Sequence, residues 1–461
     1  MKTLKPIYWL ALTAAFALAA CSKDDSTDTP PPAPEPTLTI EQTEYTLDAE
    51  EERTATVAFT AVADWTLSVV YDDAESSADW LSVTPSSGTA GEQTVELSAA
   101  RNFRASARTV YADLACGEQS VRLTVTQTAA SGDTDFTAQF DKAFAQELQK
   151  QGIIADADNI TPEDMEKIAT ITSLDVSGSY DNPGTLTSLR GIEYFEALEE
   201  LSCLYNQLTS LDLSRNTALT ELRCDYNQLT SLDVSQNTAL TNLGCSSNQL
   251  TTLDVSRNTK LIFLDCYSNE LTTLDVSRNT ALTDLRCNYN QLTALDVSRN
   301  TALTDLGCSS NQLTALDVSP HTELKYLSCS SNPLKTLDVS RNTKLIDLYC
   351  ISNELTSLDV SQNTALTTLL CYGNQLTELD ISRNTALTEL WCYGNQLTEL
   401  DISRNTELTT LWCFNNPGDG ISSFPITAWF DNDTKPSNLE LDEEQWTYGG
   451  KTITIDFRKA E

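Results

Sequence analysis

The amino-acid sequence predicts a mainly β protein, in which an antiparallel β-sandwich is followed by a long β-solenoid that is capped at both ends. The first observation is that residues 38–130 consist of short runs rich in Thr, Val and Ser, where apolar and polar side chains alternate as in half-buried strands. The second is that residues 198–416 repeat with a strict period of 21. A repeat of this length is a coil that buries its apolar face only by stacking on its neighbours.

Residues 1–20 have the features of a secretory signal peptide. Lys2 and Lys5 come before an apolar run, residues 7–20, which is too short to cross a membrane as a helix. The run ends in L-A-A-C at positions 18–21, which resembles the lipobox of bacterial lipoproteins. The resemblance implies that Cys21 is lipidated and becomes the new N-terminus. A plain signal peptide with a cysteine there by chance is the alternative.

Residues 21–37 form a linker behind this signal. The segment S-K-D-D at 22–25 resembles the acidic tag that exports lipoproteins to the outer surface of some Gram-negative anaerobes. The segment T-P-P-P-A-P-E-P-T at 29–37 is a stiff, extended polyproline spacer. Together they imply a protein that is lipid-anchored in the outer membrane, faces the cell exterior, and touches the membrane only through its anchor.

Residues 38–130 resemble the BACON domain, which implies an immunoglobulin-like β-sandwich. The order of motifs carries the resemblance: Trp65, then W-L-S-V-T-P-S-S-G at 80–88, Asn102, Arg108, and a closing V-T-Q at 125–127. The family is named for suspected carbohydrate binding, so Trp65 and Trp80 are candidate sugar platforms. We interpret both tryptophans as core residues and the sandwich as a spacer.

The 21-residue unit reads close to L-T-x-L-x-C-x-x-N-Q-L-T-x-L-D-V-S-R-N-T-A and resembles the leucine-rich repeat, with cysteine at a core leucine position. Strand side chains alternate, so Leu222 and Cys224 are expected to point inward while Arg223 and Asp225 point outward. Eleven cysteines follow the period without a slip: Cys203, Cys224, Cys245, Cys266, Cys287, Cys308, Cys329, Cys350, Cys371, Cys392 and Cys413.

The cysteine column invites three interpretations, which are disulfides, a metal site, and core packing. Export permits oxidation, and stacked strands bring neighbouring Cα atoms within disulfide range. A straight row of inward thiols, however, offers neither the paired dihedral geometry of disulfides nor four ligands converging on zinc. We therefore predict buried free thiols that pack as small apolar side chains, and no metal site.

Three polar columns accompany the cysteines. Asparagines three residues after each cysteine, from Asn206 to Asn416, are predicted to satisfy backbone groups of adjacent turns. A second asparagine column begins at Asn216, and His321 occupies one of its positions, which favours a corner variant over a catalytic base. An aspartate column, residues 212–401, stacks like charges about 5 Å apart. Neighbouring Ser, Thr and Arg side chains or water relieve that repulsion, and a row of calcium ions is the alternative.

The two ends of the solenoid carry cap signals. Phe136, Phe140, Phe144 and Leu148 share one face of an expected helix, and Thr161 with Pro162 begins a second one. With I-T-S-L-D-V-S at 171–177 and L-R-G-I at 189–192, residues 131–197 resemble the helical cap and first coils of internalin-like repeats. Residues 417–461 contain two strand patterns joined by Gly-Gly at 449–450, which predicts a β-hairpin cap like the one common in surface repeat proteins.

Variation at outward positions marks a candidate ligand surface. The residues just before and after each cysteine are mostly small or polar in the first seven coils, and they become aromatic or aliphatic in the last four. An exposed apolar patch of this kind is typical of binding sites. The alternative is that the C-terminal cap, with Phe424, Trp429 and Phe430, folds over this face and buries it. The candidate ligand-binding residues are Tyr349, Ile351, Leu370, Tyr372, Trp391, Tyr393, Trp412 and Phe414.

Composition narrows the function. With 66 acidic against 29 basic side chains the formal net charge is −37, which argues against nucleic-acid binding. A carboxylate-pair glycosidase fits the composition, but no phosphate loop, nucleophile elbow or distinct carboxylate pair stands out. We therefore expect a monomeric, non-enzymatic surface protein of the adhesin or receptor type, without a cofactor, whose solenoid binds a protein ligand. A glycan-binding lipoprotein of a polysaccharide-uptake system is the alternative, and sugar stacking on Trp391 and Trp412 would serve it. A purely structural role comes third.

Overall fold

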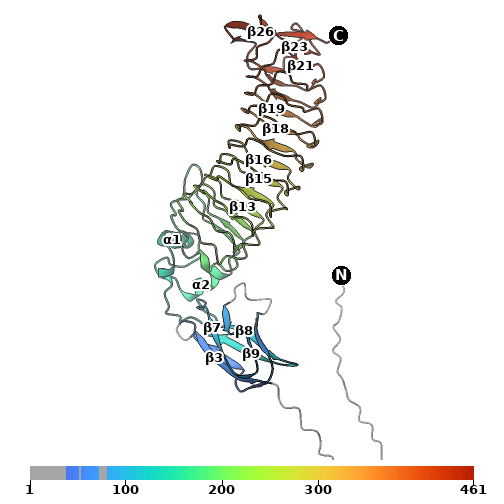
Figure 1. The fold of residues 1–461 in the computed structure, drawn as a ribbon. Helices are drawn as coiled ribbons and strands as arrows, with labels where there is room; N and C mark the ends of the chain where they lie inside the picture. Colours follow the sequence, from blue (N-terminus) through green and yellow to red (C-terminus); the bar gives the residue numbers. More distant parts are fainter. Residues whose placement is uncertain (1–37, 51–52, 72–79, 461) are drawn as a thin grey trace, which may run out of the picture.

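The computed structural model describes residues 38–50, 53–71 and 80–460. The signal peptide, the lipidation site Cys21 and the spacer lie outside the described residues. Figure 1 shows a small sandwich at one end and a long curved stack of coils that leads to the C-terminus. The described part is mainly β with few helices, as the sequence predicts. None of its helices is long and apolar enough to cross a membrane.

Residues 38–127 form two antiparallel-rich sheets around one core. The first has the strand order β1-β3-β7-β5 and the second β2-β9-β8-β4-β6, in which only the β2–β9 pair is parallel. Trp65 and Trp80 are 2% and 5% exposed and lie in this core, so our interpretation of both as core residues is confirmed. The strands are β1 (Leu38–Ile40), β2 (Glu44–Leu47), β3 (Thr54–Ala61), β4 (Trp65–Val70), β5 (Leu81–Thr84), β6 (Ser87–Gly88), β7 (Gly91–Ala99), β8 (Arg108–Cys116) and β9 (Gln119–Gln127).

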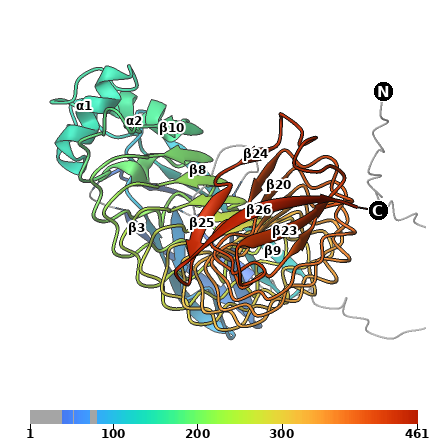
Figure 2. The same ribbon diagram turned by 90° about the horizontal axis from the view of Figure 1, so that it is seen from above.

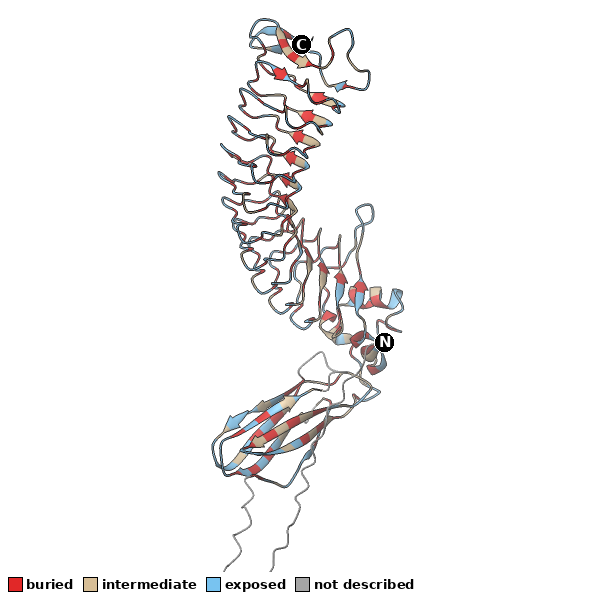
Figure 3. Ribbon diagram, turned by 90° about the vertical axis from the view of Figure 1, so that its right-hand side faces the viewer, coloured by how far each residue is buried: buried red, intermediate tan, exposed pale blue. Residues whose placement is uncertain are grey.

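One parallel sheet of 13 strands runs along the solenoid: each of the eleven repeats gives one short strand, and β10 and β24 from the flanking segments add one at each end. Neighbouring strands pair leucine to leucine, for example Leu285 with Leu306, so every coil adds the same rung to the core. The strands line the concave side of the arc (Figure 3). They are β10 (Ser173–Asp175), β11 (Glu200–Ser202), β12 (Glu221–Arg223), β13 (Asn242–Gly244), β14 (Phe263–Asp265), β15 (Asp284–Arg286), β16 (Asp305–Gly307), β17 (Tyr326–Ser328), β18 (Asp347–Tyr349), β19 (Thr368–Leu370), β20 (Glu389–Trp391), β22 (Thr410–Trp412) and β24 (Glu440–Leu441).

The eleven repeat cysteines are buried free thiols, as predicted. Each is fully buried beside fully buried leucines, for example Cys287 beside Leu285. Burial raises the pKa of the Cys287 thiol well above its usual value, and the neighbouring Cys308 adds to the shift. Cys116 of the sandwich is also buried. These thiols therefore fill space and are not available for acid–base or nucleophilic chemistry.

The asparagines that follow the cysteines bind the coils to one another. The Asn290 amide donates to the carbonyl oxygens of Cys266 in the preceding coil and Cys287 in its own coil, at 3.0 and 3.2 Å. Its oxygen accepts from the backbone N–H of Leu271 at 3.0 Å. The same pattern recurs from Asn206 to Asn416. The predicted use of a buried amide to satisfy adjacent turns is confirmed.

The second asparagine column is fully buried and donates across coils in the same way. Asn300 donates to the carbonyl oxygens of Val276 and Asn279 at 3.0 and 2.9 Å. In the place of an asparagine, His321 is fully buried, and its ring nitrogens lie 3.0 and 3.2 Å from the carbonyl oxygens of Val297 and Val318. Both ring nitrogens thus contact backbone carbonyls of the turn, as the asparagine amides do in the other coils. This supports the interpretation of His321 as a structural variant of the corner.

Residues 131–197 close the N-terminal end of the core. They contain the short 3-10 helices η1 (Thr137–Gln139) and η2 (Ile192–Tyr194) and the helices α1 (Lys142–Lys150) and α2 (Pro162–Ala169). Thr161 is the N-cap of α2 and forms a capping box with Asp164. The expectation that Phe136 and Phe140 share a helix with Phe144 is wrong, although all three are buried. The backbone of Phe140 is extended, because α1 begins only after Asp141. The Asp141 side chain caps this helix by accepting from the backbone N–H groups of Ala143 and Phe144.

The C-terminal segment is wider than a hairpin. Strands β25 (Gln445–Tyr448) and β26 (Lys451–Lys459) pair antiparallel across Gly449-Gly450. The other edge of β26 pairs parallel with β23 (Ser423–Ala428), which pairs in turn with β21 (Leu400–Asp401) of the last complete coils. Figure 2 shows these strands lying across the end of the stack. Trp446 anchors them by donating its indole N–H to the carbonyl oxygen of Asn416 at 2.9 Å.

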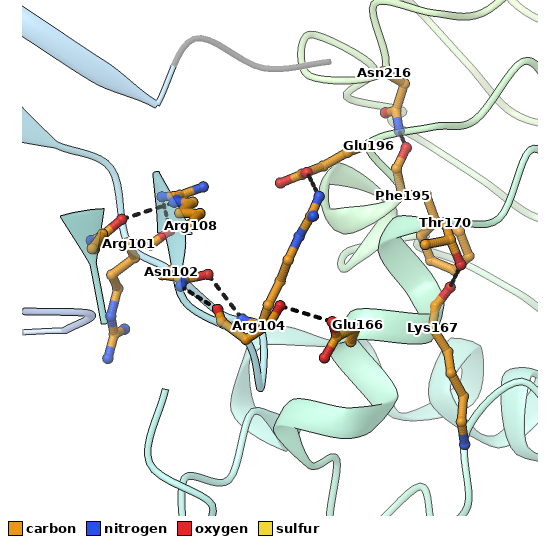
Figure 4. Close-up of polar contacts among 12 residues, drawn as sticks. Arg101, Asn102, Arg104, Arg108, Glu166, Lys167, Thr170, Phe195, Glu196 and Asn216 are labelled. Carbon is orange, nitrogen blue, oxygen red and sulfur yellow. Dashed lines mark hydrogen bonds and ion pairs between the residues drawn. The ribbon is translucent and has the colours of Figure 1, made fainter. Parts of the chain in front are cut away.

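The sandwich packs directly against the N-terminal end of the solenoid. Figure 4 shows Arg104 extending from the loop before β8 to an ion pair with Glu196. Phe103 makes edge-to-face contacts with Phe136 and Tyr194, at centroid distances of 5.5 and 4.6 Å. The buried Asn102 shapes the loop by donating to two backbone carbonyls at 2.9 and 2.8 Å. The junction is thus built from packed rings and paired charges.

Candidate functional site

The concave face presents three outward side chains from each coil. Besides the residues just before and just after each cysteine, the residues three positions before it form a third outward column, as Asp284, Asp305 and Tyr326 do. In the coil of β15 the three outward residues are Asp284, Arg286 and Asn288. In the coil of β20 they are Glu389, Trp391 and Tyr393. A ligand on this face would meet all three columns.

The eight candidate residues lie together on four neighbouring coils, and we call them the aromatic strip. All eight are partly buried. Trp391 and Trp412 stack face to face with centroids 3.9 Å apart, and Tyr372 and Tyr393 stack at 4.2 Å. Tyr393 and Phe414 continue the second stack at 4.5 Å. Five of the eight side chains therefore form two ring stacks, one of Trp391 and Trp412 and one of Tyr372, Tyr393 and Phe414.

The aromatic rings of the C-terminal cap pack elsewhere. Phe424 contacts Trp446, while Phe430 contacts both Trp429 and Phe457. Among the described residues, no ring contact joins one of these side chains to the strip. The cap instead extends the sheet, because β24 pairs with β22. The face of the strip is thus left partly exposed to solvent.

The far end of the strip carries polar atoms without partners. The indole nitrogens of Trp391 and Trp412 are buried and make no hydrogen bond in the described part of the chain. Asp442, which follows Leu441 one strand beyond Trp412, has a buried carboxylate oxygen in the same situation. Burial raises the pKa of Asp442. A buried polar group left without a hydrogen bond is costly, so these three atoms are candidates to be paired by a bound ligand or by water.

A hollow of about 350 Å³ lies beside the strip, and sequence reasoning missed it. Gly307 lines it without a side chain, and a Cβ added there would meet the Asn288 amide nitrogen at 2.6 Å. The signal was available in the sequence as a glycine at an outward position, directly after a coil with the charged residues Asp284 and Arg286. The hollow is lined by Asp284, Arg286, Asn288, Asp305, Gly307 and Tyr326.

The hollow is surrounded by more acidic than basic side chains, and its one arginine is already paired with an aspartate. Arg286 binds Asp284 at 2.9 Å and lies 5.1 Å from the ring centroid of Phe263. Burial raises the pKa of Asp284, although the hydrogen bond from Arg286 opposes the shift. Burial likewise raises the pKa of Asp265 to about 6, with the charge of Asp225 adding to it. The face around the hollow is thus short of positive charge.

The aspartate column on the far side of each coil has a structural use. Each carboxylate accepts from the backbone N–H of the serine two residues later, as Asp275 does from Ser277 at 2.9 Å. Side-chain and backbone hydrogen bonds from Ser277 lower the pKa of Asp275. In the described ranges, no group of three or more His, Cys, Asp or Glu residues is placed to hold a metal ion. The carboxylates are turn-forming groups that local donors stabilise.

Both the N-terminal sandwich and the repeat region are similar to known proteins. Residues 37–130 match a family model described as "Viral BACON domain". Internalin J of Listeria monocytogenes serotype 4b (strain F2365) is 44% identical over 100 residues, which are 21% of this chain and 10% of that protein. The solved functional domain of Internalin J from Listeria monocytogenes is 31% identical; the match covers 98% of that domain and 70% of this chain, with a TM-score of 0.43. The chain has a BACON domain and an internalin-type leucine-rich-repeat domain.

The description of the Internalin J domain names a cysteine ladder, which is also what the eleven buried thiols of this internalin-type domain form. The leucine-rich-repeat domain of APL1B is 21% identical over 60% of this chain and 85% of that one, with a TM-score of 0.47. None of these three names states an enzymatic activity. The chain matches only a tenth of the length of curated Internalin J.

Proposed function

We propose that this chain is a non-enzymatic cell-surface binding protein, of the adhesin or receptor type, which presents the concave face of its solenoid to a protein ligand. The observation that carries the proposal is the aromatic strip. Eight aromatic and aliphatic side chains stay partly exposed on one rigid face. Side chains on sheet strands are held in place by the fold, so a ligand that covers them loses little entropy in ordering them. Stacked tryptophan and tyrosine rings are typical of the centres of protein interfaces.

The stacking geometry favours a protein over a glycan. A sugar binds an aromatic platform through a free ring face. In the Trp391–Trp412 pair the rings lie 3.9 Å apart and nearly parallel, so each covers a face of the other. Tyr393 is stacked on both sides, by Tyr372 and Phe414. The strip combines these stacked rings with the aliphatic side chains of Ile351 and Leu370, and this mixture packs well against protein side chains.

The other parts of the chain have supporting roles in this proposal. The immunoglobulin-like sandwich acts as a spacer, and the helical cap and the C-terminal strands close the two ends of the core. The protein acts as a monomer and is tethered to the outer membrane through a lipid on Cys21, facing the cell exterior. Metabolic labelling with an alkyne fatty acid, with Cys21→Ala as control, tests the anchor. Protease treatment of intact cells tests the exposure.

The binding role is tested by screening the full chain in parallel against a displayed random peptide library and a glycan array. We expect peptide binders, and we expect Trp391→Ala with Tyr393→Ala to abolish their capture. Ile351→Asp, which places a charge in the strip and removes no stacked ring, should have the same effect with an unchanged melting temperature. Tyr180→Ala removes an 81% exposed tyrosine outside the strip and should change nothing.

Three results would contradict the proposal. If the chain binds only on the glycan array, its ligand is a sugar and not a protein. Peptide capture that survives Ile351→Asp would place the binding surface elsewhere. A failure of both screens would leave the structural role as the better description.

A further inference from the structure

The hollow and the aromatic strip form one continuous surface. Tyr326 lines the hollow and Tyr349 begins the strip, and their rings meet edge to face with centroids 5.3 Å apart. Asp305, Tyr326 and Asp347 lie in register on neighbouring strands. A ligand that covers the strip and continues toward the N-terminal coils would therefore enter the hollow next.

Negative charge accumulates where this ligand would pass. The outward positions of the five coils from β14 to β18 hold one arginine and four carboxylates, which are Asp265, Asp284, Asp305 and Asp347. Asp284 and Asp305 are opposite one another on adjacent parallel strands. Carboxylates at this spacing of about 4.8 Å repel each other, and a cation between them relieves the repulsion.

Arg286 does not supply that cation to the whole hollow. Its guanidinium is held by Asp284 and leans over the ring of Phe263 in the preceding coil. Asp305 accepts only from the Thr304 hydroxyl, at 2.6 Å, among its contacts in the described chain. No cation is paired with Asp305 or Asp347 within the ranges that the structure describes. The Asn288 amide covers Gly307, and the open space of the hollow lies beside the carboxylate of Asp305.

We propose that the hollow receives the side chain of a lysine or arginine from an extended, basic segment of the protein ligand. The inference rests on the proposed function, because it names the chemistry of the same ligand. Asp305 and Tyr326 lie side by side on adjacent strands and both line the hollow, so a cation there meets one carboxylate and one aromatic ring. The hollow, at about 350 Å³, has room for the long stem that carries the charge.

The test uses the full chain and the displayed random peptide library of the preceding section. Selected peptides are synthesised, and their affinities are measured by calorimetry with wild type, Asp305→Asn and Asp338→Asn. Both substitutions remove one negative charge, but Asp338 is exposed and belongs to the aspartate column on the far side of the coil. We expect enrichment of Lys and Arg, and binding about tenfold weaker with Asp305→Asn, which corresponds to the loss of one charge-assisted hydrogen bond.

Two comparisons separate a specific site from general attraction to an acidic protein. Asp338→Asn should leave the affinity unchanged, and replacing the selected Lys or Arg with norleucine or citrulline should weaken wild type but not Asp305→Asn. Equal effects of the two substitutions would overturn the inference. Peptides that need Ile351 intact but show no basic preference would also overturn it, while supporting the proposed function. If no peptide binds, the proposed function and the inference fail together.

Discussion

Replacing Asn290 with alanine tests whether the buried asparagine column holds the coils together. The side chain is 8% exposed and makes hydrogen bonds to four backbone groups, which belong to Cys266, Leu271, Cys287 and Asn288. The four backbone groups differ in whether they keep another hydrogen-bond partner when the Asn290 side chain is removed. The Cys266 and Cys287 carbonyls keep a second donor, from the asparagines of neighbouring coils, and the Asn288 carbonyl keeps the N–H of Ser268.

The N–H of Leu271 has no such reserve, because Asn290 is its acceptor and Leu271 is fully buried. An unsatisfied buried donor costs about 1–3 kcal/mol, and each lost but compensated bond costs about 0.5 kcal/mol. The expected loss in the free energy of unfolding is therefore about 2.5–4.5 kcal/mol. Asn290→Asp should be worse, since it places a carboxylate oxygen against three carbonyl oxygens in the same buried space.

Guanidinium unfolding followed by circular dichroism measures the global effect, and hydrogen exchange read by mass spectrometry locates it. We expect faster exchange of the Leu271 amide and of the coils on both sides, since each coil is stabilised by its neighbours. Gln291→Ala is the matched control, because its side chain is exposed and its backbone N–H still binds the Leu271 carbonyl. A loss for Asn290→Ala within about 0.5 kcal/mol of the control would refute the reasoning.

Two further predictions concern the cysteines and one acid of the concave face. The ladder thiols should not react with Ellman's reagent at pH 8 in the native protein and should all react in guanidinium, because burial raises their pKa; native reactivity or a disulfide found by mass spectrometry would contradict this. Asp265→Asn should stabilise the protein at pH 7 by about 1–2 kcal/mol and have no effect near pH 3, as measured by urea unfolding at both values. Burial raises the folded-state pKa of Asp265 to about 6, so the folded state binds the proton more tightly and this group's destabilising effect grows as the pH rises from about 4 to 6. An equal gain at both pH values would point to packing instead of charge.

Much of the solenoid could be predicted because its determinants repeat within 21 residues. The inward position of Cys287, the amide bonds of Asn290 and the corner role of His321 follow from strand alternation and from one spacing applied to every coil. The contiguity of the aromatic strip follows in the same way, since residues 21 apart lie side by side in the sheet. The wrong expectation for the helix at Phe140 came from a segment outside the repeat, where a single cap at Asp141 outweighed the apolar spacing.

The sequence by itself thus determined the stacking, the core and the location of the candidate surface, because a solenoid turns local periodicity directly into tertiary contact. Only the tertiary structure decided what depends on residues distant in sequence or on side-chain direction. Arg104 meets Glu196 across 92 positions, and β26 pairs in parallel with β23 beside its hairpin partner. The guanidinium of Arg286 leans over the ring of Phe263 at the hollow, and the rings of Trp391 and Trp412 stack face to face. Neither orientation is encoded in the 21-residue period, because each results from the packing of side chains that differ from coil to coil.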